Sequence, residues 1–240
     1  MSISTITSDA AGADLRTEKV ARAYGRWAPV YDLVFGKVFA RGRSAAVEAA
    51  ERIGGRVLEV GVGTGISLPQ YSRGLSLFGI DISEPMLAKA RQRVDELALR
   101  NVEGLAVMDA ESLKFADDAF DVVVAQYVVT AVPNPEAALD EFLRVVRPGG
   151  EIILTSRIGA EAGFRGFVEK LLSPVANRLG WRTEFSWDRY LRWAEGAGNV
   201  QVVERRPLPP LGHFSLIRLT KSVAPANAAS PKDASSPAIA

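Results

Sequence analysis

The sequence predicts an α/β fold in which helices cover a mainly parallel β-sheet. Short apolar runs alternate with helical patterns between residues 56 and 156, and that alternation is typical of a parallel sheet. Closely spaced glycines follow the first run at Gly61, Gly63 and Gly65, where a strand of such a sheet turns beside a ligand. With 240 residues, 48% of them hydrophobic and 24% charged, the chain fits one such domain with appendages.

Each element follows from an apolar pattern and the turn residues that bound it. Short runs rich in Val, Ile and Leu predict seven strands, at residues 56–61, 75–81, 102–108, 120–127 and 151–156, with a closing antiparallel pair at 200–206 and 214–220. Residues 147–150, Arg-Pro-Gly-Gly, are expected to form the turn into the fifth strand.

Helices are expected between these strands at residues 66–73, after Ser83, and at residues 136–146. Ser83 is a suitable N-cap for the second of them, and Pro85 suits its first turn. The side chains of that helix expected to point inward are Met86, Leu87, Ala90, Val94 and Leu97.

Residues 14–53 predict amphipathic helices before the sheet, after a flexible stretch at residues 1–13. Pro29 predicts a break in them. Basic residues, including Lys37, Arg41 and Arg43, form one face. Such helices either lie in a membrane interface or pack their apolar face on the domain, and the Tyr and Trp content favours the interface. Aromatic residues on the other face recur at helical spacing: Tyr24, Trp27, Tyr31, Phe35 and Phe39.

A second aromatic and basic segment, residues 157–199, precedes the closing pair of strands. Three of the four tryptophans lie in it, and its apolar residues follow helical spacing with a kink expected at Pro174. We interpret it as a helical lid over the substrate, and a packed helical cap without lipid contact is the alternative. Residues 222–240, mainly Ala, Pro and Ser, are expected to be disordered.

The composition excludes several classes of function. The chain has no cysteine, and its only histidine is His213, an expected turn residue. Thiolate chemistry and a His-rich metal site are therefore excluded, and we expect no bound metal. No apolar run reaches the length of a transmembrane helix, and residues 1–13 lack the order of a signal peptide, so we expect a cytoplasmic protein.

Charge is distributed unevenly along the chain. The excess of Lys and Arg over Asp and Glu is +3 in residues 1–56, −7 in residues 57–156 and +5 in residues 157–221. Basic flanks around an acidic core indicate an anionic partner that is reached through the flanks.

The stretch from Glu59 to Gly65 carries the strongest indication of function. Its spacing is G-x-G-x-G, whereas the dinucleotide fingerprint needs a third glycine where Ile66 stands. Glu59 would repel a pyrophosphate but suits a cation. Asp81 follows Gly61 by 20 residues, the spacing of a carboxylate that binds ribose hydroxyls. The implied ligand has a ribose and a positive charge but no diphosphate.

This pattern resembles the cofactor site of class I S-adenosylmethionine-dependent methyltransferases, which have a Rossmann-like seven-stranded fold. The resemblance implies S-adenosyl-L-methionine as the cofactor. It implies Glu59 at the ammonium end of the cofactor and Asp81 at its ribose. The glycines implied to lie beneath the methionine part are Gly61, Gly63 and Gly65.

The same resemblance extends to the later strands. Asp109 is similar to the residue that faces the adenine amino group, with a helix cap or loop acid as the alternative. Asp121 lies at the start of its strand, away from the carboxyl ends where ligands bind, and is expected to be structural. The further cofactor contacts that the resemblance implies are Tyr31, Ile82, Met86, Met108, Ala110 and Gln126.

A longer resemblance, over about residues 20–220, is to the soluble bacterial phosphatidylethanolamine N-methyltransferases. It is carried by residues 24–39, 56–69, 125–127 and 132–135. It implies addition of up to three methyl groups to phosphatidylethanolamine, with phosphatidylcholine as the last product. We expect a monomer, bound peripherally to the anionic inner face of the cytoplasmic membrane.

We also predict residues for the acceptor. Tyr24, Tyr31 and Tyr127 are expected to line the amine pocket, where their rings hold an ammonium by cation–π attraction. Arg157, just past the fifth strand, is expected to bind the lipid phosphate. A tyrosine, an acid or water is left as the proton acceptor.

Other functions share part of the pattern. A C- or O-methyltransferase for a quinone precursor would share the cofactor site and the turn at residues 147–150. A nicotinamide-dependent oxidoreductase would share the sheet, but Ile66 counts against it. A non-catalytic membrane module needs no ribose site, and the acidic core disfavours RNA, so no nucleic-acid partner is expected.

Overall fold

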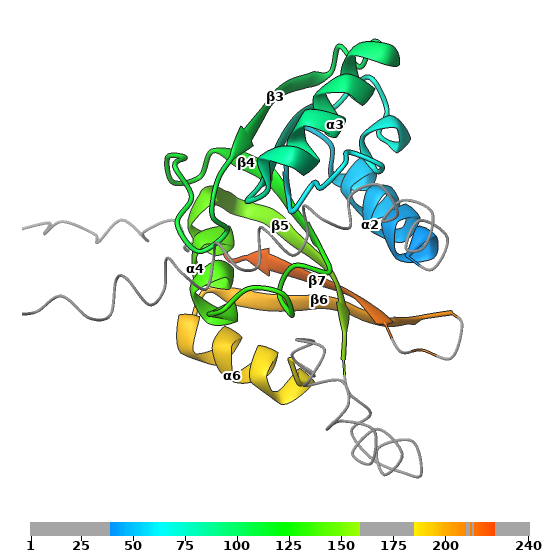
Figure 1. Ribbon diagram of the computed structural model, residues 1–240. Helices are drawn as coiled ribbons and strands as arrows, with labels where there is room; N and C mark the ends of the chain where they lie inside the picture. The colour runs from blue at the N-terminus through cyan, green and yellow to red at the C-terminus, as the bar shows by residue number, and fades with distance from the viewer. Residues whose placement is uncertain (1–38, 159–184, 210–211, 213, 224–240) are drawn as a thin grey trace, which may run out of the picture.

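A seven-stranded sheet with helices on both faces forms the body of the protein (Figure 1). The computed structural model describes residues 39–158, 185–209, 212 and 214–223. Its strand order is β3-β2-β1-β4-β5-β7-β6. The predicted α/β fold with seven strands is therefore confirmed.

The strands lie close to their predicted positions. Strands β1 to β5 pair in parallel, whereas β7 runs antiparallel to both β5 and β6. Because the chain leaves β1 for β2 on one side and later returns to β4 on the other, a crevice opens beyond the carboxyl end of β1. The strands are β1 (Arg56–Val60), β2 (Ser76–Asp81), β3 (Val102–Val107), β4 (Phe120–Gln126), β5 (Val146–Arg157), β6 (Val200–Leu208) and β7 (Phe214–Lys221).

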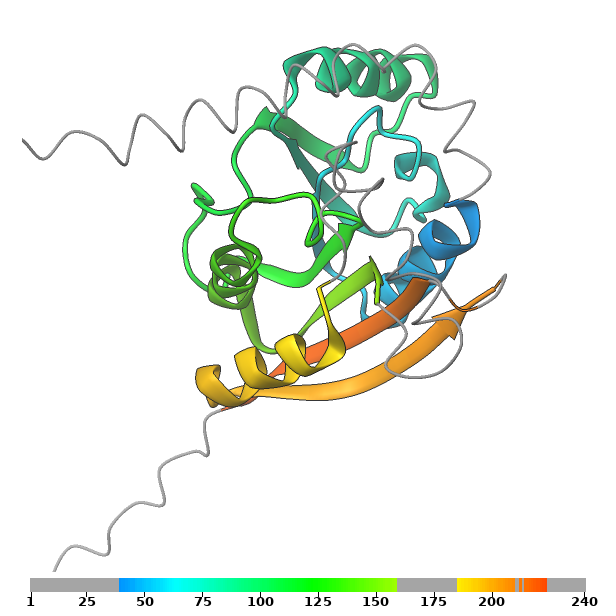
Figure 2. The same ribbon diagram turned by 60° about the horizontal axis from the view of Figure 1, so that its bottom comes forward.

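Helices cover both faces of this sheet, as the turned view in Figure 2 shows. Along β4, Val122 and Val124 belong to the core beneath α2 and α3, while Val123 and Ala125 belong to the core beneath α4 and α6. This alternation buries both faces of the strand. The helices are α2 (Ala40–Ile53), α3 (Glu84–Glu96), α4 (Pro135–Val145) and α6 (Trp187–Ala197), with a short 3₁₀ helix η1 (Leu68–Gln70).

Helix α2 is part of the domain core. Its buried face consists mostly of small residues, which allow the helix to lie close to β4, β5 and β7. For residues 40–53 the structure therefore favours domain packing over a membrane interface. The rest of the expected amphipathic segment, the flexible N-terminus, most of the expected lid with Pro174, His213 and residues 224–240 lie outside the described residues.

The helix expected at residues 66–73 is wrong, because η1 covers only Leu68–Gln70. Both the backbone nitrogen and the hydroxyl of Ser72 donate hydrogen bonds to the carboxylate of Glu51 on α2, at 2.6 and 2.8 Å. This contact, distant in sequence, holds the chain away from a helical path, and Gly74 follows two residues later.

Two details of α3 also differ from the expectation. Ser83 occupies the N-cap position, but its side chain makes no capping hydrogen bond. Leu97, expected to point inward, is 48% exposed, because α3 ends at Glu96 and the chain turns there. Met86, Leu87 and Ala90 are buried as predicted.

Residues 147–150 are not a turn before the fifth strand but a bulge within β5. The pairing with β4 shifts there, from Phe120 opposite Val146 to Val122 opposite Glu151. Asp121 holds the bulge: its carboxylate accepts hydrogen bonds from the Arg56 backbone nitrogen at 2.7 Å and from Arg147 Nε at 2.6 Å. The structural role predicted for Asp121 is confirmed.

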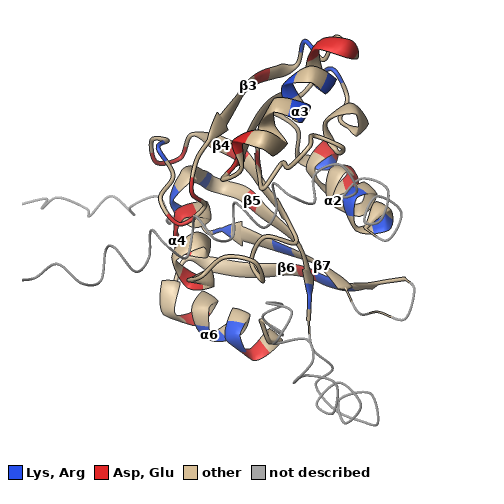
Figure 3. Cartoon of the chain, in the orientation of Figure 1, with Lys and Arg blue, Asp and Glu red and all other residues tan. Residues whose placement is uncertain are grey.

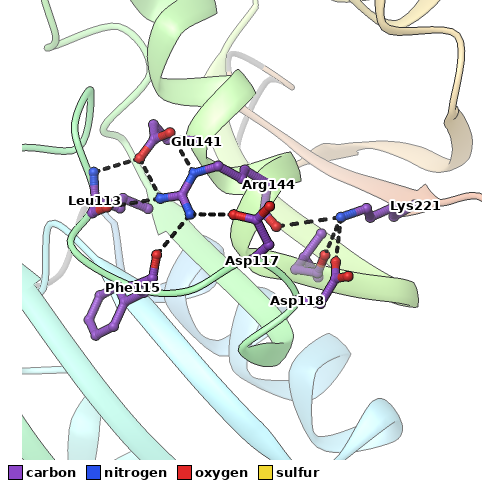
Figure 4. Close-up of polar contacts among 8 residues, drawn as sticks. Leu113, Phe115, Asp117, Asp118, Glu141, Arg144 and Lys221 are labelled. Atoms are coloured by element: carbon purple, nitrogen blue, oxygen red, sulfur yellow. Dashed lines mark hydrogen bonds and ion pairs between the residues drawn. The ribbon is translucent and has the colours of Figure 1, made fainter.

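A polar network ties the β3–β4 connection to α4 and β7 (Figure 4). Arg144 of α4 is its centre, and Lys221 of β7 extends it by donating hydrogen bonds to Asp118 and to two backbone carbonyls. The network fixes the segment that follows Asp109. The groups that accept hydrogen bonds from Arg144 are the carboxylates of Glu141 and Asp117 and the carbonyls of Leu113 and Phe115.

Charged residues follow the uneven distribution seen in the sequence. Figure 3 shows Lys and Arg on β6 and β7, both signs of charge on α2 and α6, and Asp and Glu on α4 and the segments around β4. Within the described part of the chain, no helix has the length and hydropathy needed to span a bilayer.

Candidate active site

A cavity of about 180 Å³ opens beyond the carboxyl ends of β1, β2 and β4, at the crevice created by the strand order. The predicted cofactor residues that line the cavity lie at or after the ends of β1, β2, β3 and β4. The beginning of α2 lines the other side of the cavity. The predicted residues that line it are Glu59, Gly61, Gly63, Asp81, Ile82, Met86, Met108, Asp109, Ala110, Gln126 and Tyr127.

The glycine turn forms one wall of the cavity. Gly61 and Gly63 have φ angles of 69° and 56°, which side chains rarely allow. A Cβ on Gly61 would also lie 2.4 Å from Val128 Cγ2, whereas one on Gly63 would meet no protein atom within 4 Å. Gly63 therefore leaves its backbone open to a ligand.

Gly65 serves the turn differently from the other two glycines. It does not line the cavity, and a Cβ on it would lie 3.2 Å from Ala90 Cα of α3. With a φ of 70°, its role in the structure is close packing of the turn against α3. A direct cofactor contact from Gly65 stays a prediction.

Asp81 ends β2 and fastens the glycine turn. Its carboxylate accepts hydrogen bonds from the backbone nitrogens of Gly63 and Ser83, each at 2.9 Å. Burial raises its pKa, and these backbone donors partly offset the effect. Each carboxylate oxygen retains a lone pair, so Asp81 can still accept hydrogen bonds from a ligand hydroxyl.

Glu59 is a buried carboxylate at the end of β1, with only 3% of its surface exposed. Its Oε1 accepts hydrogen bonds from the Ser67 hydroxyl and, at 3.4 Å, from Gln126 Nε2. Its Oε2 has no hydrogen-bond partner within the described chain. Burial raises its pKa from 4.5 to about 7, although Ser67, Tyr71 and the charge of Arg43 act in the opposite direction. Such a group is set to pair with a cation.

Asp109 begins the connection after β3 and faces the cavity. Its Oδ1 accepts a hydrogen bond from the Glu111 backbone nitrogen at 2.9 Å, so it also closes a local turn. Asp109 is therefore the expected loop acid and also lines the cavity, while its contact with the adenine amino group stays a prediction. Met86, Met108 and Ile82 supply apolar surface beside it.

These residues fit an S-adenosyl cofactor. The partnerless oxygen of Glu59 calls for a cationic group, and the open Gly63 backbone permits close approach. Asp81 retains acceptor capacity for ribose hydroxyls, and the apolar wall by Met86 and Met108 suits a flat base.

Tyr127 marks the opposite side of the cavity. It has a φ of 63°, unusual for a residue with a side chain, and its backbone nitrogen donates to Thr155 O at 2.7 Å. Its ring packs against Phe39 and Phe214, with centroids 4.2 and 5.2 Å away. Burial raises the pKa of its hydroxyl to about 12. Tyr127 therefore remains a neutral hydrogen-bond donor at physiological pH.

Sequence reasoning missed the contribution of α2 to the cavity. Phe39 was predicted for an apolar helix face and Arg43 for a solvated basic face, yet both line the cavity. Arg43 is its one basic residue among those described. No local pattern could reveal this, because the placement depends on how α2 packs across the ends of β4 and β5.

The remaining predicted acceptor residues are not brought together in the described cavity. Arg157 ends β5 opposite Phe214, whose ring contacts Tyr127, but it is not among the residues that line the cavity. Tyr24 and Tyr31 lie outside the described residues. Within the described ranges, no group of three or more acidic or histidine side chains could hold a metal ion.

Comparison with known proteins identifies the family. A model described as a methyltransferase domain matches residues 58–154. The phosphatidylethanolamine N-methyltransferase of Cereibacter sphaeroides is 42% identical over 207 residues, which cover 86% of this chain and 100% of that protein. The chain belongs to the class I S-adenosylmethionine-dependent methyltransferases. The enzyme therefore uses S-adenosylmethionine as its cofactor, as predicted.

A second relative and one solved structure are also similar to the enzyme. The demethylmenaquinone methyltransferase of Renibacterium salmoninarum is 32% identical, over 70% of the enzyme and 73% of that protein. A solved structure of Haemonchus contortus Phospholethanolamine N-methyltransferase 2, in complex with phosphomonomethylethanolamine and S-adenosylhomocysteine, has a TM-score of 0.62 at 17% identity. The match covers 83% of the enzyme and 58% of that chain, and it agrees with the class I methyltransferase fold.

Proposed function

We propose that the enzyme methylates the head-group nitrogen of phosphatidylethanolamine, adding up to three methyl groups, at an anionic membrane surface. The observation that carries the proposal is the 42% identity to a phosphatidylethanolamine N-methyltransferase over the whole length of that relative. The match extends well beyond the methyltransferase domain at residues 58–154, so it includes parts of the chain that face an acceptor.

The residues on the cofactor side of the cavity bind S-adenosylmethionine and orient its methyl group. When bound, S-adenosylmethionine supplies a methyl group on a sulfonium, which departs as a thioether when the acceptor nitrogen attacks in line. Glu59 pairs with the ammonium end, Asp81 holds the ribose, and Asp109 faces the base. Alignment of this kind can lower a barrier by about 7–11 kcal/mol without a covalent intermediate.

Tyr127 is the acceptor-side residue for which the structure offers most support. Its hydroxyl stays protonated because its pKa is about 12 and donates to the Phe39 carbonyl, so its oxygen orients the amine by accepting a hydrogen bond from an amine N–H and does not take the proton. Its ring face attracts the methylated ammonium by about 0.5–2 kcal/mol. The proton of the amine then leaves to a carboxylate or to water.

The other acceptor-side assignments extend the proposal beyond the described cavity. Tyr24 and Tyr31 complete the amine pocket, and Tyr31 also contacts the cofactor. Arg157 binds the lipid phosphate, and Arg43 is a second candidate because it lines the cavity. The aromatic and basic segments at residues 14–39 and 157–186 hold the enzyme on the inner face of the cytoplasmic membrane, where it acts as a monomer.

A quinone-type C- or O-methyltransferase is the second candidate. The 32% identity to a demethylmenaquinone methyltransferase favours it. The ring that accepts the methyl group in such a substrate is flat and uncharged, so it would not need a cation on the acceptor side of the cavity.

Product analysis separates the two candidates. The purified enzyme is incubated with radiolabelled S-adenosylmethionine and either phosphatidylethanolamine vesicles or vesicles that contain demethylmenaquinol, and the lipids are then separated. We expect label in the mono-, di- and trimethylated forms of phosphatidylethanolamine. Label only in the quinone would overturn the proposal.

A further inference from the structure

Gly42 on α2 occupies a position where a side chain would collide with Tyr127. A Cβ built on Gly42 would lie 2.0 Å from the Tyr127 hydroxyl oxygen and 3.1 Å from Tyr127 Cζ. Gly42 lies inside a helix and is buried. Since glycine is a poorer helix former than alanine, the close approach of the hydroxyl gives a physical reason for glycine at this position.

Tyr127 is fixed from several other directions at once. Its backbone nitrogen donates a hydrogen bond to Thr155 O, and its φ of 63° is a backbone conformation that side chains rarely adopt. Its ring packs against Phe39 and Phe214. Its hydroxyl donates to the Phe39 carbonyl at 3.4 Å, at the beginning of α2. The surface of α2 at Gly42 is therefore the remaining wall of the space that holds the hydroxyl.

We propose that Gly42 is a positioning residue for methyl transfer: its lack of a side chain seats the Tyr127 hydroxyl against α2 and so fixes the aromatic wall that faces the acceptor. The inference rests on the proposed function in one respect, since it gives Tyr127 a role at the acceptor nitrogen. The atom that must give way to a Cβ is the far end of the tyrosine side chain. The G42A variant therefore keeps its fold and displaces the Tyr127 ring.

A double-mutant cycle tests the coupling. The variants are G42A, Y127F and the double variant G42A/Y127F, each compared with the parent enzyme. Gly196 in α6 provides a matched control, because a Cβ there would meet no atom within 4 Å. Three quantities are measured: kcat and KM with phosphatidylethanolamine vesicles, the Kd of S-adenosylhomocysteine by calorimetry, and the thermal unfolding midpoint Tm.

The proposal predicts a background-dependent effect of the alanine. In the parent, G42A lowers kcat/KM for the vesicles at least tenfold and changes the Kd of S-adenosylhomocysteine by less than threefold. In the Y127F background, which lacks the colliding oxygen, G42A costs less than twofold. In the Y127F background, the better helix propensity of alanine at position 42 raises Tm by about 2–4 °C. In the parent, the same substitution gives no such rise. G196A leaves activity unchanged.

Equal losses in both backgrounds, or full activity of G42A with a raised Tm, would overturn the proposal. If G42A fails to fold in the parent, folding of the double variant supports the coupling, and failure of both contradicts it. The comparison of Tm among the parent and the three variants needs no lipid. A parent enzyme that is inactive on phosphatidylethanolamine would therefore refute the proposed substrate, whereas the Tm values would still test the coupling between Gly42 and Tyr127.

Discussion

The two sides of the cavity are assembled in different ways. The cofactor side, Glu59 to Gly63 with Asp81 and Asp109, consists of residues that each end a neighbouring parallel strand. The acceptor side, Phe39, Arg43 and Tyr127, joins the start of a helix to the end of β4, 88 residues apart in the chain. Strand ends meet by the rules of the sheet, whereas the acceptor side depends on how one helix packs.

The comparison teaches where the enzyme can vary. Cofactor binding is tied to backbone geometry, such as the hydrogen bond from Gly63 to Asp81. The acceptor side relies on aromatic packing and on a single glycine, which can change without disturbing the sheet. We therefore expect relatives with different acceptors to retain the first side and to differ in the second.

Replacement of Glu59 should give the largest effect, a loss of cofactor affinity that leaves the acceptor side of the cavity unchanged. E59Q keeps the shape of the side chain but removes the charge opposite a cationic ammonium. Loss of one partner of a buried pair costs about 3–5 kcal/mol, so the Kd of S-adenosylhomocysteine should rise at least 100-fold in calorimetry. E103Q, on an exposed glutamate, serves as the control. A Kd within threefold of the parent would remove Glu59 from the ammonium site.

Replacement of Asp81 should be the next largest effect. D81N places an amide where the carboxylate is proposed to accept hydrogen bonds from the ribose hydroxyls, so one hydroxyl loses a charged acceptor at a cost of about 1–3 kcal/mol. The Kd of S-adenosylhomocysteine should rise about 10- to 100-fold. D95N, at an exposed position on α3, should bind like the parent. Equal binding by D81N would show that Asp81 only shapes the turn.

Most of the predicted cofactor residues line the cavity, because the sheet brings the ends of neighbouring apolar runs to one edge. Gly65 packs on α3 and does not line the cavity, which the sequence could not show, because only the three-dimensional distance to Ala90 separates a packing glycine from a cavity glycine. Sequence reasoning missed Phe39 and Arg43 in the cavity for the same kind of reason. The expected helix after β1 failed because Glu51 of α2 holds Ser72.

Paired arginine variants would sharpen the account of the acceptor side. We expect loss of the phosphate contact to raise the KM for phosphatidylethanolamine vesicles about tenfold, the size of one charge-assisted hydrogen bond. R157Q tests the residue past β5, and R43Q tests the residue within the cavity. The variant with the higher KM identifies the phosphate contact, and S-adenosylhomocysteine affinity controls for damage to the cofactor side. Unchanged KM values in both would exclude these two arginines.

The smallest effect concerns the stability of the enzyme without cofactor. Because the pKa of Glu59 is raised to about 7 in the folded state, the protonated carboxyl favours folding at low pH, and this contribution is lost as pH rises through 7. Between pH 6 and pH 8 the free energy of unfolding should fall by about 1 kcal/mol through Glu59. Chemical denaturation at both pH values, in parent and E59Q, measures the difference. An equal fall in both proteins would assign it to other groups.

The pH dependence of cofactor binding tests the central claim most directly: a buried, partly protonated Glu59 must ionise to pair with the ammonium of the cofactor. Calorimetric titration with S-adenosylhomocysteine should give a Kd that tightens about tenfold from pH 6 to pH 8, with release of a proton near pH 6, and no such trend in E59Q. A Kd that stays constant over this range in the parent enzyme would contradict the account.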